Sequence, residues 1–499
     1  MLFSSREFLF VFLPIALLLY HGARHLAGGK AALAILSITS LFFYGWWNPP
    51  YLLLLLGSIV GNLFLARAIK ARGSGTKGGG WLLTVGVAAN LAAIGYFKYR
   101  NFFIENIGYL FGESWDLGPI FVPLAISFFT FQQIAFLCDV ADGKADPKDG
   151  LGFVTFVALF PQLIAGPIVL YREMALQFDA VEKGDGKGFT LFAAGLVVFV
   201  LGLFKKVVLA DSIGPYADTA FANVEMLTFL EAWAAALAYS FQLYFDFSGY
   251  SDMAVGLGLM LGFSLPINFD TPFRAVSMID FWKRWHITMT RFFMMYLFSP
   301  VALALTRFSM ERRLTAKGEF VLAVAVPIVV TFLLSGLWHG AAWTYVAFGG
   351  VNAVGLVANH AWKKGKLPKL PRWVGWTLTM MTVVVSFVFF RAASLADAGH
   401  MLALMVDPWE LVLPNWLSGI AESAGLPWHT LSFFATGSYT IRLAAWLAVL
   451  LPLSLLIPNM SKTAMSLRFG WGTAFAIAGM AWLSVSLLDR PQAFIYFQF

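Results

Sequence analysis

Charged residues are scarce in this sequence, and their scarcity indicates the class of protein. Only 12% of the 499 residues are Asp, Glu, Lys or Arg, whereas 59% are hydrophobic. Soluble globular chains carry roughly 25% charged residues, so water is not the main solvent of this chain. The formal net charge of +7 comes without a basic-aromatic patch, and we therefore expect no nucleic-acid partner.

Cysteine is also nearly absent, and several catalytic motifs are missing. With Cys138 as the single cysteine, the chain can form neither an internal disulfide nor a cysteine metal cluster. The sequence has no phosphate-binding Gly loop followed by Lys-Ser/Thr, no Gly-x-Ser-x-Gly elbow and no His-Glu-x-x-His pair. These absences argue against ATP hydrolysis and zinc proteolysis, and we expect no bound metal or cofactor.

Long apolar runs are abundant instead. The stretches Phe8–Tyr20, Tyr51–Ala66 and Phe320–Gly336 are apolar throughout, whereas strands of an outer-membrane barrel would alternate in polarity. Runs of this length predict an all-α, polytopic integral membrane protein with roughly 11–14 transmembrane helices. We expect the first run to be a retained span, because Met1–Phe8 is too weakly basic to begin a signal peptide.

Basic loops predict the orientation of these spans. Clusters of Lys and Arg at residues 67–77 and 363–372 belong in the cytoplasm by the positive-inside rule, and Lys205 and Lys206 fall on the same side. Successive loops must lie on alternate sides of the membrane, and this alternation fails if every apolar run between Glu231 and Arg313 crosses it. We therefore expect a re-entrant or broken segment between residues 251 and 306. Non-helical backbone is tolerated at membrane depth only where it is buried in protein or lines a water-filled cavity.

His339 stands out among the seven histidines. The block Gly336-Leu337-Trp338-His339-Gly340 places its ring between two apolar runs, and an ionisable group inside a membrane indicates function by default. A neutral imidazole can take a proton from a hydroxyl, and the glycines allow a helix break or a close backbone approach of a substrate. A histidine that only cross-links helices by hydrogen bonds is the alternative, which the sequence leaves open.

His286 lies in the block Phe281–Thr288, where two Trp and two cations surround it. Aromatic residues next to Lys and Arg are typical of membrane surfaces, so an interfacial anchor is the alternative to a functional role. Interfacial solvation explains the remaining histidines, which are His21, His25, His360, His400 and His429.

Two polar clusters interrupt apolar sequence. The stretch Tyr244–Asp252 carries two carboxylates, and its Ser251 and Asp252 are suitable N-cap residues for a helix that begins after a break. The stretch Pro161–Pro167 predicts a kinked or broken helix with Gln162 facing inward. We interpret both clusters as scaffold.

Taken together, these blocks resemble the membrane-bound O-acyltransferase (MBOAT) family, in its alginate O-acetylation and teichoic-acid D-alanylation branch. The resemblance covers nearly the whole chain, and it is most specific in four blocks that occur in the same order. It implies a ring of helices with re-entrant or broken helices around a central cavity, in a single domain over residues 1–499 with a catalytic core at about 119–360. The four blocks are Phe160–Pro167, Tyr244–Leu259, Phe281–Thr288 and Gly336–Gly340, and the terminal Phe494–Phe499 is similar as well.

The resemblance also implies roles for individual residues. It assigns the catalytic residue to His339 and the second family position to His286. Met289–Pro300 lacks the Arg-Asp pair and the glycines usual in the polysaccharide branch, so the resemblance implies acyl transfer but leaves the acceptor or partner surface open. Residues expected to shape the substrate cavity are Trp285, Trp338, Asp246, Gln162, Ser248 and Tyr250.

The function implied is transfer of an acyl group, expected to be acetyl, from a cytoplasmic thioester such as acetyl-CoA across the bacterial inner membrane. The acceptor would be an extracellular or cell-envelope polysaccharide, reached directly or through a periplasmic acyltransferase or another polysaccharide-modifying partner. His339 would act as general base, and His286 would polarise the donor carbonyl. The alternative is a non-catalytic carrier of a polysaccharide, lipid or acyl intermediate, but carriers often show internal repeats, which this sequence lacks.

Overall fold

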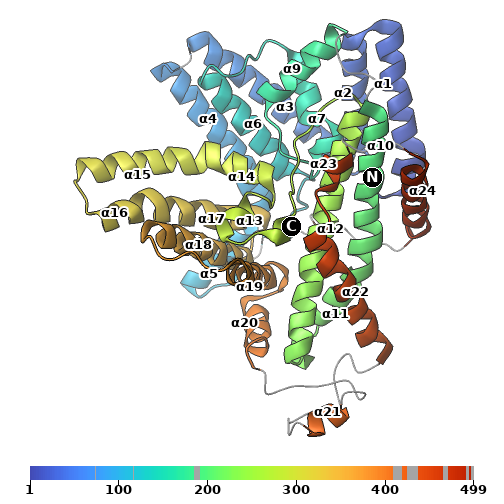
Figure 1. The fold of residues 1–499 in the computed structure, drawn as a ribbon. Coiled ribbons are helices and arrows are strands. Elements are labelled where there is room, and N and C mark those ends of the chain that lie inside the picture. Colours follow the sequence, from blue (N-terminus) through green and yellow to red (C-terminus); the bar gives the residue numbers. More distant parts are fainter. Residues whose placement is uncertain are drawn as a thin grey trace. The chain divides into compact units, whose positions relative to one another are not determined.

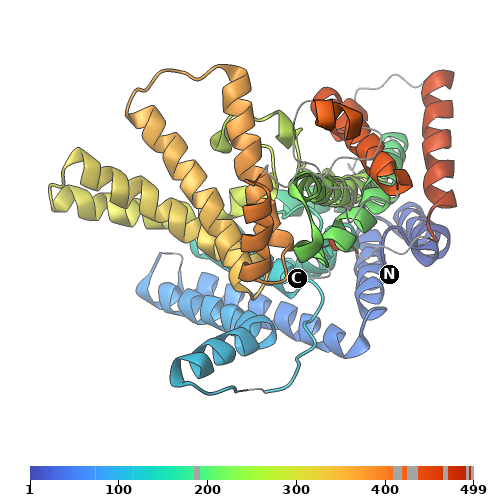
Figure 2. The same ribbon diagram turned by 90° about the horizontal axis from the view of Figure 1, so that it is seen from below.

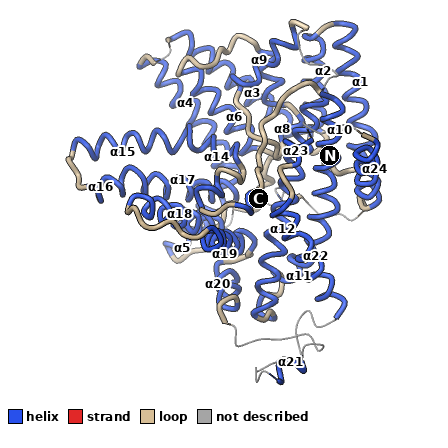
Figure 3. The backbone as a smooth tube through the Cα atoms, viewed as in Figure 1, coloured by secondary structure: helices blue, strands red, loops and turns tan. Residues whose placement is uncertain are grey.

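The computed structural model describes residues 1–73, 75–115, 117–184, 191–407, 418–423, 437–464, 470–489 and 494–495. Within these ranges the chain forms helices joined by loops and contains no strand (Figure 1, Figure 3). The all-α class predicted from the sequence is confirmed.

The chain divides into two compact units. Unit 1 comprises Met1–Phe204, Gly249–Ile267 and Ser461–Asp489, and unit 2 comprises Lys205–Ser248, Asn268–Met460 and Arg490–Phe499. One boundary between them falls within a helical run and another within a single long helix. The single MBOAT-like domain stays a prediction.

Unit 1 contains the helices of residues 1–204 and two helices from near the C-terminal end of the chain. Its helices are η1 (Phe8–Phe12), α1 (Leu13–Ala27), α2 (Gly29–Gly45), α3 (Pro49–Arg72), α4 (Lys77–Ile94), η2 (Gly95–Tyr99), α5 (Arg100–Phe111), α6 (Ile126–Ala141), α7 (Gly150–Ala158), α8 (Phe160–Leu163), α9 (Tyr171–Glu182), α10 (Phe192–Phe204), α23 (Met460–Ala464, which begins at the boundary) and α24 (Trp471–Ser486).

Unit 2 contains the helices of the middle of the chain, and α12 continues from it into unit 1. These helices are η4 (Lys205–Ala210), α11 (Asp211–Phe221), η5 (Val224–Met226), α12 (Phe229–Met260), η6 (Pro272–Arg274), α13 (Met278–Trp282), α14 (Ile287–Phe293), η7 (Met294–Phe298), α15 (Ser299–Glu311), α16 (Ala316–Phe320), η8 (Val321–Ala325), α17 (Val326–His339), α18 (Trp343–Lys364), α19 (Arg372–Arg391), α20 (Leu395–Leu404), α21 (Ser418–Ser423) and α22 (Gly437–Leu456).

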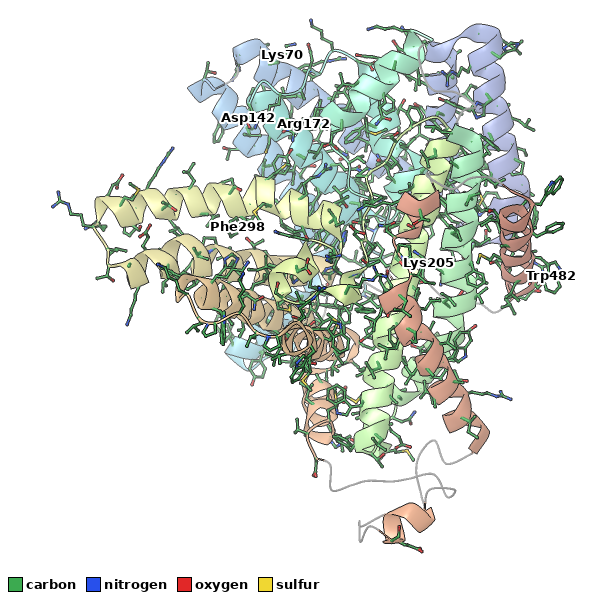
Figure 4. All side chains as sticks on the ribbon, viewed as in Figure 1. Lys70, Asp142, Arg172, Lys205, Phe298 and Trp482 are labelled. Carbon is green, nitrogen blue, oxygen red and sulfur yellow. The ribbon has the colours of Figure 1, made fainter. Side chains whose placement is uncertain are left out.

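Several of these helices are suited to a membrane. Among the described residues, seven helical runs are long and apolar enough to cross a bilayer, and large apolar side chains such as Trp482 stand exposed on the outer side of their helices (Figure 4). A polytopic membrane protein is confirmed, whereas the total of roughly 11–14 spans stays a prediction. The seven runs are Phe8–Ala27, Pro49–Arg72, Gly78–Phe111, Phe192–Phe221, Ile287–Glu311, Ala316–His339 and Arg372–Arg391.

The predicted helix break at Ser251 and Asp252 is wrong, because α12 runs uninterrupted from Phe229 to Met260. Its glycines serve close helix packing within unit 1. A Cβ on Gly195 of α10 would lie 2.6 Å from the Gly256 carbonyl oxygen, and one on Gly202 would lie 2.6 Å from that of Gly249. Small residues allow this approach of two backbones in a membrane. Asp252 hydrogen-bonds to the Ser461 hydroxyl and caps no helix.

The break predicted at Pro161–Pro167 is confirmed. Helix α7 ends at Ala158, the short α8 follows, and Leu159 between them has a non-helical backbone with ψ of 106°. Gln162 faces inward, where its side-chain amide donates to the Phe156 carbonyl oxygen over 2.5 Å. Proline and glycine act locally on the backbone, which explains why sequence alone predicted this break.

Two other sequence interpretations require correction. Lys205 and Lys206 do not lie in a cytoplasmic loop, because they are buried in η4 within the helical run Phe192–Phe221. The stretch from Phe292 to Leu305 is likewise unbroken, since α14, η7 and α15 form one run. The broken segment expected between residues 251 and 306 is found between α12 and α14, where only the short η6 and α13 interrupt the loops.

Candidate active site

Unit 2 places His339 at the last position of α17, where Gly340 then continues in extended conformation. Helices α17 and α18 form a closely packed hairpin, and α19 returns beside α18 (Figure 2). A Cβ on Gly336 would collide with the Tyr345 carbonyl group, and one on Gly349 would collide with that of Phe332. The glycine near His339 therefore serves the approach of α18, and the predicted break occurs at Gly340.

Aromatic rings surround His339, whose side chain is 5% exposed. The ring centroid lies 4.8 Å from that of Trp338, 5.1 Å from Phe390 of α19 and 5.8 Å from Phe348 of α18, each in an edge-on arrangement. Three helices thus contribute walls that hold the imidazole in one place and exclude water from it.

His286 is held in a different way. It is fully buried (0% exposed) and precedes α14 with a left-handed backbone, φ 43° and ψ 53°. A non-glycine residue rarely adopts this conformation, and such residues cluster at functional sites. Asn268 holds the turn in place, because its carbonyl oxygen accepts the Ile287 N–H over 2.9 Å.

The side chain of Asn268 also determines which nitrogen of the His286 ring carries the proton. Its Oδ1 accepts the Thr288 backbone N–H at 3.2 Å and the Thr288 hydroxyl at 2.9 Å, and lies 3.1 Å from His286 Nδ1. Because a backbone N–H can only donate, the shared atom is the amide oxygen, and Nδ1 must donate to it. In the neutral ring, the lone pair is then on Nε2.

Trp338 lies between the two histidines. Its ring centroid is 6.2 Å from that of His286 and 4.8 Å from that of His339. Phe247 of α12 also packs against the His286 ring, in a T-shaped arrangement with the centroids 4.8 Å apart. The structure thus brings His286, Trp338 and His339 together at one place in unit 2, as the sequence led us to expect.

The other predicted cavity residues fall into two groups. In unit 2, Trp285 is buried and stacks on Phe281 at 5.6 Å, and Asp246 and Ser248 are buried on either side of Phe247. Gln162 and Tyr250 belong to unit 1. Their place at the same cavity stays a prediction.

An apolar cavity of about 250 Å³ lies within unit 2 among α13, α14, η7, α17 and α18. It reaches Met289 and Ser335, whose side chains lie 4.0 Å apart. Ser335 precedes His339 by one helical turn on the same face, so the cavity ends close to the histidines. Phe298, another lining residue, lies between the ribbons of α15 and α17 (Figure 4). Other lining residues are Trp282, Lys283, Thr290, Phe293, Thr331 and His360.

Two hydroxyl groups of this cavity are available to a ligand. Thr331 is 7% exposed, and neither its hydroxyl nor that of Thr290 has a hydrogen-bond partner among the described residues. A buried polar group without a partner costs free energy unless a ligand or water satisfies it. Sequence reasoning missed both threonines and Asn268. One signal was available, because Thr331, Ser335 and His339 recur every four residues and so share a helix face.

Comparison with known proteins gives the family. A sequence model of the MBOAT, membrane-bound O-acyltransferase family matches residues 149–396, which include both histidines. A peptidoglycan O-acetyltransferase of Helicobacter pylori is 36% identical over 437 residues, covering 81% of this chain and 80% of that protein. The chain belongs to the MBOAT family.

Further relatives agree with this assignment. A protein named "Probable alginate O-acetylase" of Pseudomonas aeruginosa is 38% identical, with 82% of this chain and 76% of that protein aligned. A teichoic acid D-alanyltransferase of Streptococcus thermophilus is 28% identical, with 54% of this chain and 68% of that protein aligned. The MBOAT chain is therefore a membrane O-acyltransferase, and the carrier alternative has no support from these matches.

Proposed function

We propose that this chain transfers an acetyl group from an acyl thioester to a hydroxyl group of a cell-envelope polysaccharide or of a partner protein. The observation that carries the proposal is the pair of buried histidines around Trp338 at the end of an apolar cavity. The names of the two O-acetylating relatives support acetyl as the group transferred.

His339 acts as the general base in this proposal. The acceptor hydroxyl attacks the thioester carbonyl carbon while the imidazole takes the hydroxyl proton. The new C–O ester bond forms, the C–S bond breaks, and the imidazolium returns the proton to the departing thiolate. The ring begins and ends neutral, so one histidine serves successive turnovers.

The role predicted for His286, stabilising an oxyanion, depends on the protonation state of its ring. The neutral ring donates from Nδ1 to Asn268 and has a lone pair on Nε2, so it has no second N–H to give to the carbonyl oxygen of the donor. His286 can stabilise an oxyanion only as an imidazolium. Substitution of Asn268 tests this condition directly.

The cavity suits the arm of the thioester donor. Its apolar walls accept the chain of the arm, and the hydroxyls of Thr290 and Thr331 can donate to amide oxygens such as those of coenzyme A or a carrier-protein arm. Lys283, an exposed residue of the lining, supplies positive charge for a phosphate group. Ser335 and Met289 mark the end at which the thioester would meet His339.

We place the protein in the bacterial inner membrane as a multi-pass enzyme. The basic clusters at residues 67–77 and 363–372 support a cytoplasmic side, from which the acyl thioester would enter. Membrane lipids surround the helices, and a periplasmic acyltransferase or another polysaccharide-modifying protein would receive or direct the acetyl group.

The test compares H339A with a matched histidine variant in cells. His400 of α20 is exposed, so H400A removes a histidine without touching the site. We expect H339A to lower ester-linked acetyl on envelope polysaccharide by about 10²–10⁴-fold, the usual contribution of a general base, while H400A leaves it unchanged. Alkaline release of acetate measures the ester, and membrane levels of each variant are compared. Normal acetylation by H339A refutes the proposal.

A further inference from the structure

Three ionisable side chains meet in the interior of unit 2, away from the cavity. The Lys206 ammonium lies 2.6 Å from Asp211 Oδ1 and 2.7 Å from Asp246 Oδ1. Their side chains are 3%, 8% and 2% exposed, respectively. Lys205, labelled in Figure 4, is the residue next to Lys206 in η4. One cation thus bridges two carboxylates in a buried place.

The local backbone explains how Lys206 reaches Asp211. The two residues are five positions apart, and in an α-helix such residues point about 140° away from each other. Lys206 lies in the π-helical turn η4, which ends just before Asp211 begins α11. A π-turn brings residues five positions apart onto one side, and such turns are frequent at functional sites.

Stability alone is a weak reason for this cluster. Taking charges out of water is expensive, and replacing a buried ion pair by apolar residues is often neutral or stabilising. Ionisable residues in membrane-spanning segments are rare and tend to mark function. Lys206 and Asp211 lie within the apolar run Phe192–Phe221, so a role beyond holding helices together is expected.

Asp246 connects the cluster to the active site. One carboxylate oxygen pairs with Lys206, and the other accepts the Ile495 backbone N–H over 3.0 Å. The next residue of α12, Phe247, packs its ring edge-on against His286 at 4.8 Å. Because Asp246 is held at both oxygens, the rotation of α12 is fixed, and with it the position of the Phe247 ring.

We infer that Lys206 is a positioning residue of the acyltransferase site. It holds Asp246, and through the fixed rotation of α12 it keeps Phe247 against the His286 ring. This inference rests on the proposed function, because the expected effect is on the rate of acyl transfer. A ring that shifts by about 1 Å at a reacting centre lowers the rate about 10²-fold. The binding of the donor in the cavity is not affected, since none of these residues lines it.

A double-mutant cycle in purified protein tests this link. K206M removes the ammonium group, and F247L removes the ring that packs against His286. Each single variant should lower kcat by up to about 10²-fold with the KM for the acetyl thioester unchanged. K206M/F247L should be no slower than the slower single variant, because both act through one contact. A double variant slowed by the product of the two factors overturns the inference.

Lys205 provides the matched control, since it is buried in the same π-turn. K205M should keep kcat, and an equal loss in K205M and K206M would show a general effect of removing a buried lysine and would overturn the inference. If K206M does not fold, D246N is measured in its place, because the amide keeps the shape of the side chain and an oxygen for the Ile495 N–H.

A second readout does not depend on turnover. The ring ¹⁵N resonances of His286, recorded in histidine-labelled protein, should shift in K206M and stay in place in K205M. Unchanged His286 resonances in K206M overturn the inference. Because this measurement needs no acyl transfer, its failure is distinguishable from a failure of the proposed function, which H339A tests.

Discussion

The two histidines of the site are both buried, but unit 2 holds them by different means. His339 ends a helix whose one glycine, Gly336, packs against α18, and its neighbours are aromatic rings. His286 lies in a strained turn, where Asn268 is hydrogen-bonded both to the His286 ring and to the backbone N–H of the next residue, Ile287. Packing positions the first and polar contacts position the second, so different substitutions should disturb each.

The largest effect is expected when both histidines are removed. H339A and H286A should each lower the transfer rate, with H339A down by about 10²–10⁴-fold. The variant H286A/H339A should be no slower than the slower single variant, because residues that act as one unit give non-additive losses. Transfer by purified protein in detergent measures all three. Losses that multiply would show that the two histidines contribute independently and do not act as one unit.

The helix packing that positions His339 is tested at Gly336. A methyl group there would collide with the Tyr345 carbonyl group, so G336A should push α17 from α18. We expect about 1–3 kcal/mol of destabilisation from overpacking and a displaced His339. The midpoint of thermal unfolding and the transfer rate both report it. G350A is the control, since its Cβ would approach only the Leu333 side chain at 3.9 Å. A G336A protein as stable and active as G350A would contradict this role of the glycine.

The hydrogen bonds that position His286 are tested at Asn268. N268L removes the acceptor for His286 Nδ1 and for Thr288, and should cost about 1–3 kcal/mol for the donors left unpaired, with a lower kcat. N268D keeps an oxygen at the same place and adds a negative charge that favours imidazolium. If His286 stabilises an oxyanion, N268D should retain or exceed the wild-type kcat near neutral pH. An N268D protein as slow as N268L would exclude the imidazolium role.

The smallest effect is expected in the cavity. T331V keeps the shape of the side chain and removes a hydroxyl that has no hydrogen-bond partner among the described residues. If that hydroxyl donates to the thioester arm, the KM for the donor should rise roughly 10-fold, the equivalent of one hydrogen bond, with kcat unchanged. T306V is the control, because Thr306 bonds to the Ala302 carbonyl in its own helix. An unchanged KM in T331V would place the arm elsewhere.

Much of the fold was predictable because the signals are local. Apolar runs indicate membrane helices, and the break at Pro161 follows from a residue that cannot continue a helix. The supposed break at Ser251 and Asp252 was wrong because Gly249 and Gly256 pack against α10, a contact between residues far apart in the sequence. Lys206 was misplaced for a similar reason, since its partner Asp246 is distant in the chain.

The site was predictable in part. His339 and His286 were singled out because their blocks resemble a family, and the structure brings both to Trp338, whereas their catalytic roles stay a prediction. Asn268 was missed because the sequence does not indicate which residue an amide side chain in a loop will contact. Thr331 could have been found, since it lies on the same helix face as His339.

The proposed mechanism depends most on His339 as the group that takes the acceptor proton. Single-turnover transfer from a saturating acetyl thioester, by purified wild-type and H339Q protein, tests this claim most directly, since glutamine keeps a polar side chain and cannot act as a base. The account predicts that H339Q binds the donor normally and transfers about 10²–10⁴-fold more slowly. Transfer by H339Q at the wild-type rate would contradict it.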